Sequence, residues 1–366
     1  MRYKNILLLF AFSLLPWTLS AKDGVSMDWW SGLSKEWKDV FRNEIGFMGM
    51  GISADGLQQI GALKTINCAG IDDFGENRNI HSLEPLKALP YLEEVDCSYA
   101  MIKDLTPLQS LKRLKKLNLA YCPISDISAL ATVTSLERLF LSGTSVKSIA
   151  VLEELENLKE IDLFENKQFN DWESIALFDD LEVLSLDDTN LKDISFIRKM
   201  RDLRTLKISY TKVEDLSPLK KLKNLEQLQM QKIPAEDISA LSRLKKLQYL
   251  SMNSCKGITD LSPLEDLTHL EHLFISFTGV TDLSPLASHK TLKELTFSST
   301  RVQDITPLSK LPSLSILIFT DSKVTSVAAA GAMPSLTVLY FRDSKVPEDS
   351  IRAFQEKYPK IETDFF

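Results

Sequence analysis

Apolar residues return in the same order every 22 or 23 residues along most of the chain. Each repeat contains the pattern Leu-x-x-Leu-x-Leu, whose alternating end predicts a short strand with one buried face. A second apolar stretch follows, as in Asp282–Leu286, where Ser284 can cap a turn and Pro285 fixes φ. A short turn or 3₁₀ segment is therefore expected there instead of a long helix. The pattern starts at residues 63, 92, 114, 136, 158, 181, 203, 225, 247, 270, 292, 314 and 336.

A coil of this kind has one strand and one turn, and neither can bury its apolar side alone. Successive coils must therefore stack, with their strands forming a parallel sheet at about 4.8 Å per coil. We predict an α/β (β-rich) leucine-rich solenoid, a curved right-handed array of 13 coils over residues 63–345. The parallel sheet lies on the concave side, and short turns or 3₁₀ segments lie on the convex side. In this phase Leu206 points inward, whereas Ser209 is expected on the exposed concave side.

Both ends of such an array need a cover, because the outermost coils would otherwise expose their apolar core. Residues 22–62 are predicted to form a helical N-terminal cap, in which Ser34 caps a helix over residues 35–45. Residues 346–366 are predicted to form a C-terminal cap, with a helix over 347–358 and a last short strand over 360–362. Residues 1–21 combine a basic start, a short apolar run and small residues at their end. This is the layout of a secretory signal peptide, so we expect an exported protein, periplasmic or extracellular.

The stretch from Leu270 to Leu286 shows the repeat most fully, with Leu273, Ile275 and Leu283 at its apolar positions. On these residues the chain resembles bacterial leucine-rich repeat proteins of the internalin-type, 22-residue class, over about residues 63–345. The family often places Asn at the turn after the strand, whereas this chain mostly has Thr or Ser, whose hydroxyl can still bond neighbouring backbone. The resemblance implies a binding scaffold, and it names no partner because function resides in the variable surface.

The formal net charge is −7, and it approaches −9 once Arg2 and Lys4 leave with the signal peptide. A nucleic-acid binder needs a strong basic surface, so the overall balance argues against nucleic acid as a partner. No second long apolar run follows the first, so we expect no transmembrane segment in the mature chain.

Catalytic and metal-binding motifs are scarce. There is no Gly-rich phosphate loop and no Gly-x-Ser-x-Gly elbow, so we expect neither an enzyme nor a cofactor. His269 and His272 would point to opposite faces of a strand and do not form a metal pair. The acidic insertion at residues 71–79 lacks a recognised calcium spacing. His289 occupies an apolar position of the repeat, where a locally adapted turn is the simplest explanation. The aspartates at one turn offset, such as Asp282, are expected to cap the turn beside them.

Cys68 and Cys97 hold the inward strand position of adjacent coils. Small buried apolar residues are the favoured interpretation, and a disulfide between them stays open because the chain is expected to be exported. Trp29, Trp30 and Trp37 are expected to pack within the N-terminal cap.

The outward residues of the strands are the best candidates for function, because aromatic and β-branched residues there have no role inside the coil. We predict that the concave face binds a macromolecule, most simply a protein, and that the chain is a monomer. A carbohydrate or cell-wall ligand is the second hypothesis, based on Trp29, Trp30, Tyr99, Tyr121 and Tyr210. An intracellular regulatory scaffold is the third, and packing of the C-terminal cap over this surface stays open. The predicted contact residues are Tyr249, His272, Phe274, Ile316, Ile318, Val338, Tyr340 and Arg342.

Overall fold

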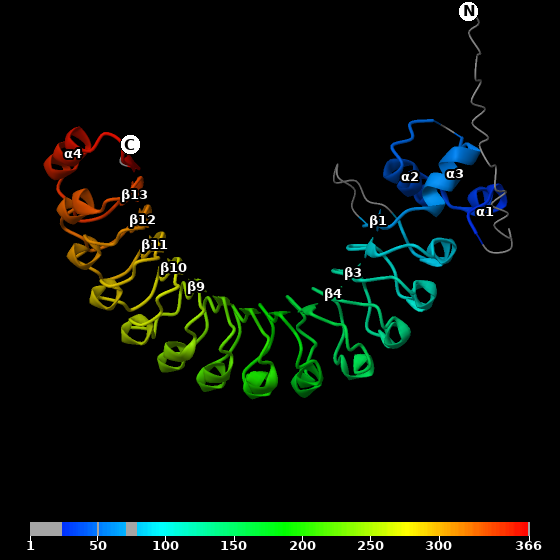
Figure 1. Ribbon diagram of the computed structural model, residues 1–366, viewed down its shortest axis with the longest axis horizontal. Coiled ribbons are helices and arrows are strands. Elements are labelled where there is room, and N and C mark those ends of the chain that lie inside the picture. The colour runs from blue at the N-terminus through cyan, green and yellow to red at the C-terminus, as the bar shows by residue number, and fades with distance from the viewer. Residues whose placement is uncertain (1–23, 50, 71–78, 365–366) are drawn as a thin grey trace, which may run out of the picture.

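The computed structural model describes residues 24–49, 51–70 and 79–364, and in them the chain forms one open arch (Figure 1). A single sheet of 14 parallel strands follows the chain order from β1 to β14. This confirms the predicted solenoid with one strand per coil. The strands are β1 Thr65–Asn67, β2 Glu94–Asp96, β3 Lys116–Asn118, β4 Arg138–Phe140, β5 Glu160–Asp162, β6 Val183–Ser185, β7 Thr205–Lys207, β8 Gln227–Gln229, β9 Tyr249–Ser251, β10 His272–Phe274, β11 Glu294–Thr296, β12 Ile316–Ile318, β13 Val338–Tyr340 and β14 Glu362–Thr363.

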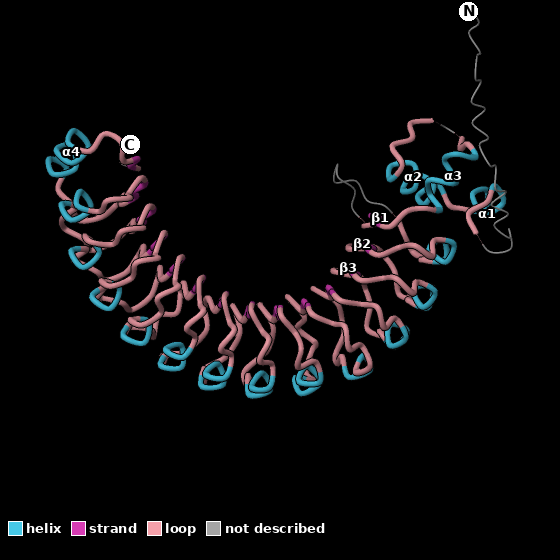
Figure 2. The backbone as a smooth tube through the Cα atoms, viewed as in Figure 1, coloured by secondary structure: helices cyan, strands magenta, loops and turns pink. Residues whose placement is uncertain are grey.

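The strands line the inner side of the arch, and short helical segments line its outer side (Figure 2). These outer segments are 3₁₀ helices, because a helix of 3 to 6 residues is all that a 22-residue coil leaves room for. They are η1 Glu84–Ala88, η2 Thr106–Ser110, η3 Ser128–Thr132, η4 Ala150–Leu152, η5 Trp172–Leu177, η6 Ser195–Lys199, η7 Ser217–Lys221, η8 Ser239–Arg243, η9 Ser262–Leu264, η10 Ser284–Leu286, η11 Thr306–Leu308 and η12 Ala328–Ala332.

The core is one continuous row of leucines and other apolar residues between the sheet and the 3₁₀ segments. Leu203, Leu206 and Ile208 are fully buried in their coil, as the repeat predicts. Ser209 is also buried, at 3% exposure, and it bonds the carboxylate of Asp187 in the preceding coil. The expectation that Ser209 lies on an exposed side is therefore wrong, because the chain turns away from the sheet directly after the strand.

An aspartate holds the turn before eight of the described 3₁₀ segments, and a serine hydroxyl takes its place before η1, η4 and η12. The Oδ1 atom of Asp282 accepts the backbone N–H of Ser284 at 2.8 Å, and the same bond recurs at Asp104, Asp126, Asp193, Asp215, Asp237, Asp260 and Asp304. Ser284 does not cap the segment as expected, because its hydroxyl donates to the same carboxylate. The aspartate column is structural, as predicted.

The turn after each strand uses two different bonds. In the Thr coils the hydroxyl bonds its own coil, as Thr300 Oγ1 does with the carbonyl of Phe297 at 2.8 Å. Asn166, Cys122 and Cys255 instead bond a carbonyl of the preceding coil. The residue before this position has a positive φ in coil after coil, for example Tyr99 at 60° and Phe277 at 59°. Its N–H is bonded to the following coil, which holds this uncommon backbone conformation.

An alternating row of charges precedes the strands at the edge of the sheet. Ion pairs join neighbouring coils along it, including Lys64 with Glu93 at 3.5 Å and Lys115 with Glu137 at 3.4 Å. We call this row the charge ladder: Lys64, Glu93, Lys115, Glu137, Lys159, Glu182, Arg204 and Glu226. Each exposed pair contributes little by itself, but opposite signs meet at every step.

Helices cover both ends of the array. At the start lie α1 Met27–Gly32, α2 Lys35–Glu44 and α3 Ala54–Gly61. Ser34 accepts the N–H of Trp37 at the start of α2, and Trp37, Val40 and Phe41 are buried. Trp30 is also buried, and the ring of Trp29 lies 5.1 Å from that of Phe41, so the tryptophans pack in the cap as expected.

At the other end lie α4 Glu348–Lys357 and β14. Phe354 of α4 is buried against the last coil. The last strand begins two residues later than expected, because the N–H of Ile361 bonds the carbonyl of Tyr358 and closes a turn first. The predicted signal peptide and nearly all of the acidic insertion at 71–79 lie outside the described residues.

Candidate binding face

Two rows of outward side chains cross the C-terminal part of the sheet. The strand register aligns Tyr249, His272, Glu294, Ile316 and Val338 in the first row. It aligns Ser251, Phe274, Thr296, Ile318 and Tyr340 in the second row. Seven of the eight predicted contact residues therefore lie in these rows, and Arg342 lies two residues after the end of β13.

The apolar members of these rows form a surface that we call the apolar patch: Tyr249, Phe274, Ile316, Ile318 and Val338. All five are half-buried, because each leans on its neighbours along the sheet. The rings of Tyr249 and Phe274 lie 5.2 Å apart, and those of Tyr249 and His272 lie 6.3 Å apart. Partly buried aromatic rings held against each other lose few rotamers when a partner covers them.

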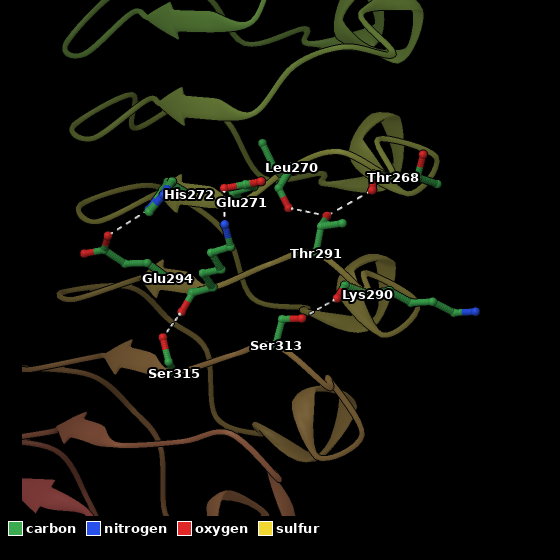
Figure 3. A network of polar contacts seen from close by, with 10 residues as sticks. Thr268, Leu270, Glu271, His272, Lys290, Thr291, Glu294, Ser313 and Ser315 are labelled. Atoms are coloured by element: carbon green, nitrogen blue, oxygen red, sulfur yellow. Dashed lines mark hydrogen bonds and ion pairs between the residues drawn. The ribbon is translucent and has the colours of Figure 1, made fainter.

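One polar pair lies within the apolar patch. Nδ1 of His272 and Oε2 of Glu294 are 3.0 Å apart across β10 and β11 (Figure 3). Behind this pair, away from the concave face, hydroxyl groups of Thr291, Ser313 and Ser315 bond backbone carbonyls of preceding coils. Burial and the Glu294 charge together raise the pKa of Tyr249, so its phenol is neutral and can donate a hydrogen bond.

The C-terminal tail contacts the last two of the predicted contact residues, Tyr340 and Arg342. The hydroxyl of Tyr340 donates to Glu362, and this bond raises the pKa of Tyr340. Nε of Arg342 donates to the carbonyl of Asp364 at 3.4 Å, while the Asp364 carboxylate accepts the N–H of Phe341 at 2.8 Å. The C-terminal cap thus packs on Tyr340 and Arg342, as one of the two alternatives expected. Tyr249 and Phe274 lie four and three strands away from β13.

The N-terminal half of the concave face is charged. Glu94 forms ion pairs with both Lys116, at 3.7 Å, and Arg138, at 3.5 Å. Further along, burial raises the pKa of Glu160 and raises that of Asp187 to about 6. Sequence reasoning missed Asp187, because a carboxylate directly after a strand gives no sign that the next coil will cover it.

Aromatic side chains also line the rim where the strands end. The rings of Tyr99 and Tyr121 stack 4.7 Å apart with an angle of 10°, and the Tyr121 hydroxyl donates to Glu165 at 3.0 Å. Burial and this hydrogen bond raise the pKa of Tyr121 to about 12. Gly143 leaves room for the Tyr121 ring, since a Cβ there would lie 2.4 Å from it. Tyr99, Tyr210 and Phe277 are each about half exposed.

The remaining candidates do not assemble a reactive site. His269 is exposed and its Nδ1 faces the carbonyl of Lys245, away from His272. His289 is buried at 2% exposure, and neither of its ring nitrogens has a hydrogen-bond partner. Among the described residues, no group of His, Cys, Asp and Glu is arranged to hold a metal ion.

Cys68 and Cys97 are free thiols with their sulfur atoms 2.9 Å apart, both fully buried as predicted. Burial raises the pKa of Cys97, and hydrogen bonding to Cys68 raises it further, so the Cys97 thiol is protonated and a poor nucleophile. In the part of the chain that the structure describes, no helix is long and apolar enough to cross a membrane.

Comparison with known proteins gives a consistent result for the fold. A family model for the leucine-rich repeat region matches residues 76–357. An internalin (InlF) from Listeria monocytogenes is 24% identical with a TM-score of 0.77, over 95% of this chain and 99% of that chain. A leucine-rich repeat protein from Leptospira interrogans is 18% identical with a TM-score of 0.62, over 87% of this chain and 94% of that one.

A plant structure also shares the fold. It is the ectodomain of the receptor kinase GASSHO1/SCHENGEN3 from Arabidopsis thaliana in complex with CASPARIAN STRIP INTEGRITY FACTOR 2. It is 18% identical with a TM-score of 0.60, over 84% of this chain and 39% of that one. No curated protein matches the chain in sequence.

Proposed function

Because the chain belongs to the leucine-rich repeat family, we propose that it is a non-enzymatic binding protein that recognises a protein partner through its concave face. The apolar patch carries this proposal. Monomeric proteins rarely leave a cluster of apolar side chains uncovered, and apolar side chains on both sides of a polar strand, here Glu294 and Thr296 of β11, are typical of an interaction site.

The aromatic pair Tyr249 and Phe274 is the expected centre of binding. Aromatic residues dominate the energetics of interfaces, because they bury much area at a small cost in side-chain entropy. His272 and Glu294 lie directly beside them and offer hydrogen-bonding groups that can select among partners. Thr296 and the hydroxyl groups around it supply the polar surroundings that accompany such a centre.

Polypeptide ligands are consistent with what this fold carries elsewhere. The structures of two plant receptors of this fold are complexes, one with CASPARIAN STRIP INTEGRITY FACTOR 2 and one of RGFR1 with RGF2. This supports a protein partner for the present chain but does not identify it. We further propose that the protein is exported and acts in the periplasm or outside the cell, on the basis of residues 1–21. Cell fractionation tests the location.

The decisive experiment is affinity capture with the full chain, followed by measurement of the affinity of the captured protein. The double variant Tyr249→Ala/Phe274→Ala is expected to weaken binding by about 2 kcal/mol or more, the scale of interface hot spots. Phe140→Ala is the matched control, since this aromatic residue is half-buried on the same face in β4. Unchanged binding by the double variant, or an equal loss in the control, would place the partner elsewhere.

A carbohydrate ligand is a second candidate, and the stack of Tyr99 and Tyr121 favours it. Flat, partly exposed aromatic rings can pack on the apolar face of a sugar ring, and Glu165 fixes one of them by its hydrogen bond. A glycan array probed with the full chain and with Tyr99→Ala tests this. Binding that depends on Tyr99 and not on Phe274 would favour the carbohydrate hypothesis over the protein one.

A further inference from the structure

The overall negative charge of the chain conceals a strongly positive segment. Residues 198–246 contain thirteen Lys and Arg against six Asp and Glu, whereas the whole chain has a net charge of −7. This segment spans η6, η7 and η8, which belong to consecutive coils packed directly against one another. The periodic sequence therefore brings its cations together on the convex surface.

We call these cations the basic patch: Arg198, Lys199, Arg201, Lys220, Lys221, Lys223 and Arg243. All are exposed, and within the described parts of the chain none of them forms an ion pair with a carboxylate. The charge of Lys220 contributes to the lowered pKa of Asp215 and Asp237, and both carboxylates also accept hydrogen bonds from the turns that they cap. Cations still outnumber carboxylates by thirteen to six over residues 198–246, so the segment carries a net positive charge.

The patch lies at the middle of the arch, on the side opposite the concave face. η6 and η7 are the central pair of the twelve 3₁₀ segments, and they lie at the lowest part of the arch in Figure 1. The middle of a convex surface is the part that meets a flat surface first. Coils on both sides are acidic instead, with Glu153, Glu154, Glu156, Asp179 and Asp180 before the patch and Glu265 and Asp266 after it.

The composition of the patch identifies the class of partner. It has three positions in each of the η6 and η7 coils and Arg243 in the η8 coil, so it is two-dimensional and does not follow a single track. η6, η7 and η8 carry no exposed aromatic side chain, because Phe196 is buried, so the patch offers nothing on which bases or sugar rings could stack. Four of its seven cations are lysines, which act as point charges on flexible stems. These features fit a planar layer of anionic headgroups.

We propose that the basic patch docks the arch on an anionic lipid membrane surface, with the concave face turned away from the lipid. The acidic coils on both sides of the patch are repelled by the same surface, so contact is confined to the middle of the arch. In this orientation the apolar patch stays open to a soluble partner. Attraction of this kind falls off within a Debye length and is lost at high salt.

The test measures sedimentation of the full chain with vesicles of phosphatidylcholine alone and with about 30 mol% phosphatidylglycerol, which supplies the anionic headgroups. The apolar stretch Ile6–Trp17 is identical in every protein compared. Binding to phosphatidylcholine alone therefore reports its contribution, and the difference between the two vesicles reports the charge. We expect binding to the anionic vesicles that disappears at about 0.5 M salt.

The triple variant Lys220→Gln/Lys221→Gln/Lys223→Gln is expected to lower the partition coefficient on anionic vesicles by about tenfold or more. The control Lys310→Gln/Lys323→Gln/Lys345→Gln removes the same charge from exposed lysines of the C-terminal coils and is expected to bind like the wild type. If the first variant unfolds, as thermal unfolding would show, Arg198→Gln/Arg201→Gln takes its place.

Equal binding to the two kinds of vesicle, an equal loss in the two triple variants, or an unaffected patch variant would each overturn the proposal. So would binding of a soluble polyanion such as heparin without sedimentation on the anionic vesicles. Tyr249→Ala/Phe274→Ala is expected to retain vesicle binding. Failure of membrane docking and failure of the protein-binding proposal are therefore distinguishable.

Discussion

The inward leucines of neighbouring coils bury one another completely, so the contribution of each depends on its neighbours. Leu206 has no exposed surface and lies between Leu184 and Leu228 in the strand register. Leu206→Ala is expected to lower the free energy of unfolding by about 2–5 kcal/mol, through lost burial and a residual cavity. Thr205 on the same strand is half-buried on the concave side. Thr205→Ala should change the free energy of unfolding by under about 0.5 kcal/mol. Chemical denaturation of both variants checks this, and equal losses would contradict the observed phase of the strand.

His289 places a titratable ring where other coils have leucine, such as Leu267 and Leu311. Burial lowers its pKa, and this effect outweighs the opposing contributions of the nearby backbone of Leu264 and Leu286 and of the Glu265 charge. Between its folded value and the ordinary value of about 6.5, the unfolded state binds more protons than the folded state. His289 should therefore lower the free energy of unfolding increasingly as the pH falls below about 6.5.

The variant His289→Leu isolates this effect. Its free energy of unfolding is expected to exceed that of the wild type, and the difference should grow as the pH falls from 7.5 to 5.5. Asp187 titrates in an overlapping range with the opposite sign, since its raised pKa favours proton uptake by the folded state. Both proteins contain Asp187, so its contribution cancels when their free energies of urea unfolding are subtracted at each pH. If the difference between the two proteins were the same at both pH values, the folded protein would tolerate the charged ring.

At the scale of the element, the turn before most of the 3₁₀ segments depends on one carboxylate, as Asp282 shows before η10. Asp282→Ala removes the acceptor of the Ser284 N–H and should lower the free energy of unfolding by about 0.5–1 kcal/mol. Asp282→Asn keeps the oxygen acceptor and should cost less, so the pair separates hydrogen bonding from charge. Hydrogen bonds to Ser284 lower the pKa of Asp282, so its contribution is present at neutral pH and is lost as the pH falls below about 4. Denaturation of the two variants at pH 7 checks this, and equal losses would assign the effect to charge.

Elements of the array were predictable because each apolar position is repeated and buried in the same way. Leu206 and the aspartate turns follow from this periodicity, and so do the outward rows at Tyr249 and Phe274. The burial of Ser209 did not follow, because it depends on where the chain leaves the sheet. Nor did the bonds from Glu362 and Asp364 to the last strand, because the tail is outside the repeat and its register is set by contacts that no period describes.

At the scale of the whole molecule, the arch separates its surfaces by character. The concave side is charged near Glu94 and apolar near Phe274, and the basic patch lies on the convex side of the coils between these two regions. The net charge of −7 does not rule out a basic surface of this kind. Net charge is a sum over the chain, and it does not show which residues the 22-residue repeat brings together. The same periodicity that makes the fold easy to recognise concentrates any recurring surface residue into a stripe.

The charge ladder constrains how the number of coils in such an array can change during evolution. Loss of a single coil, for example the one that carries Glu137, would place Lys115 beside Lys159, whereas loss of two neighbouring coils restores opposite signs at the junction. Like charges on directly adjacent strands are destabilising. Along β1 to β8, length changes in even steps are therefore favoured over odd ones, and relatives of this chain should differ there by pairs of repeats.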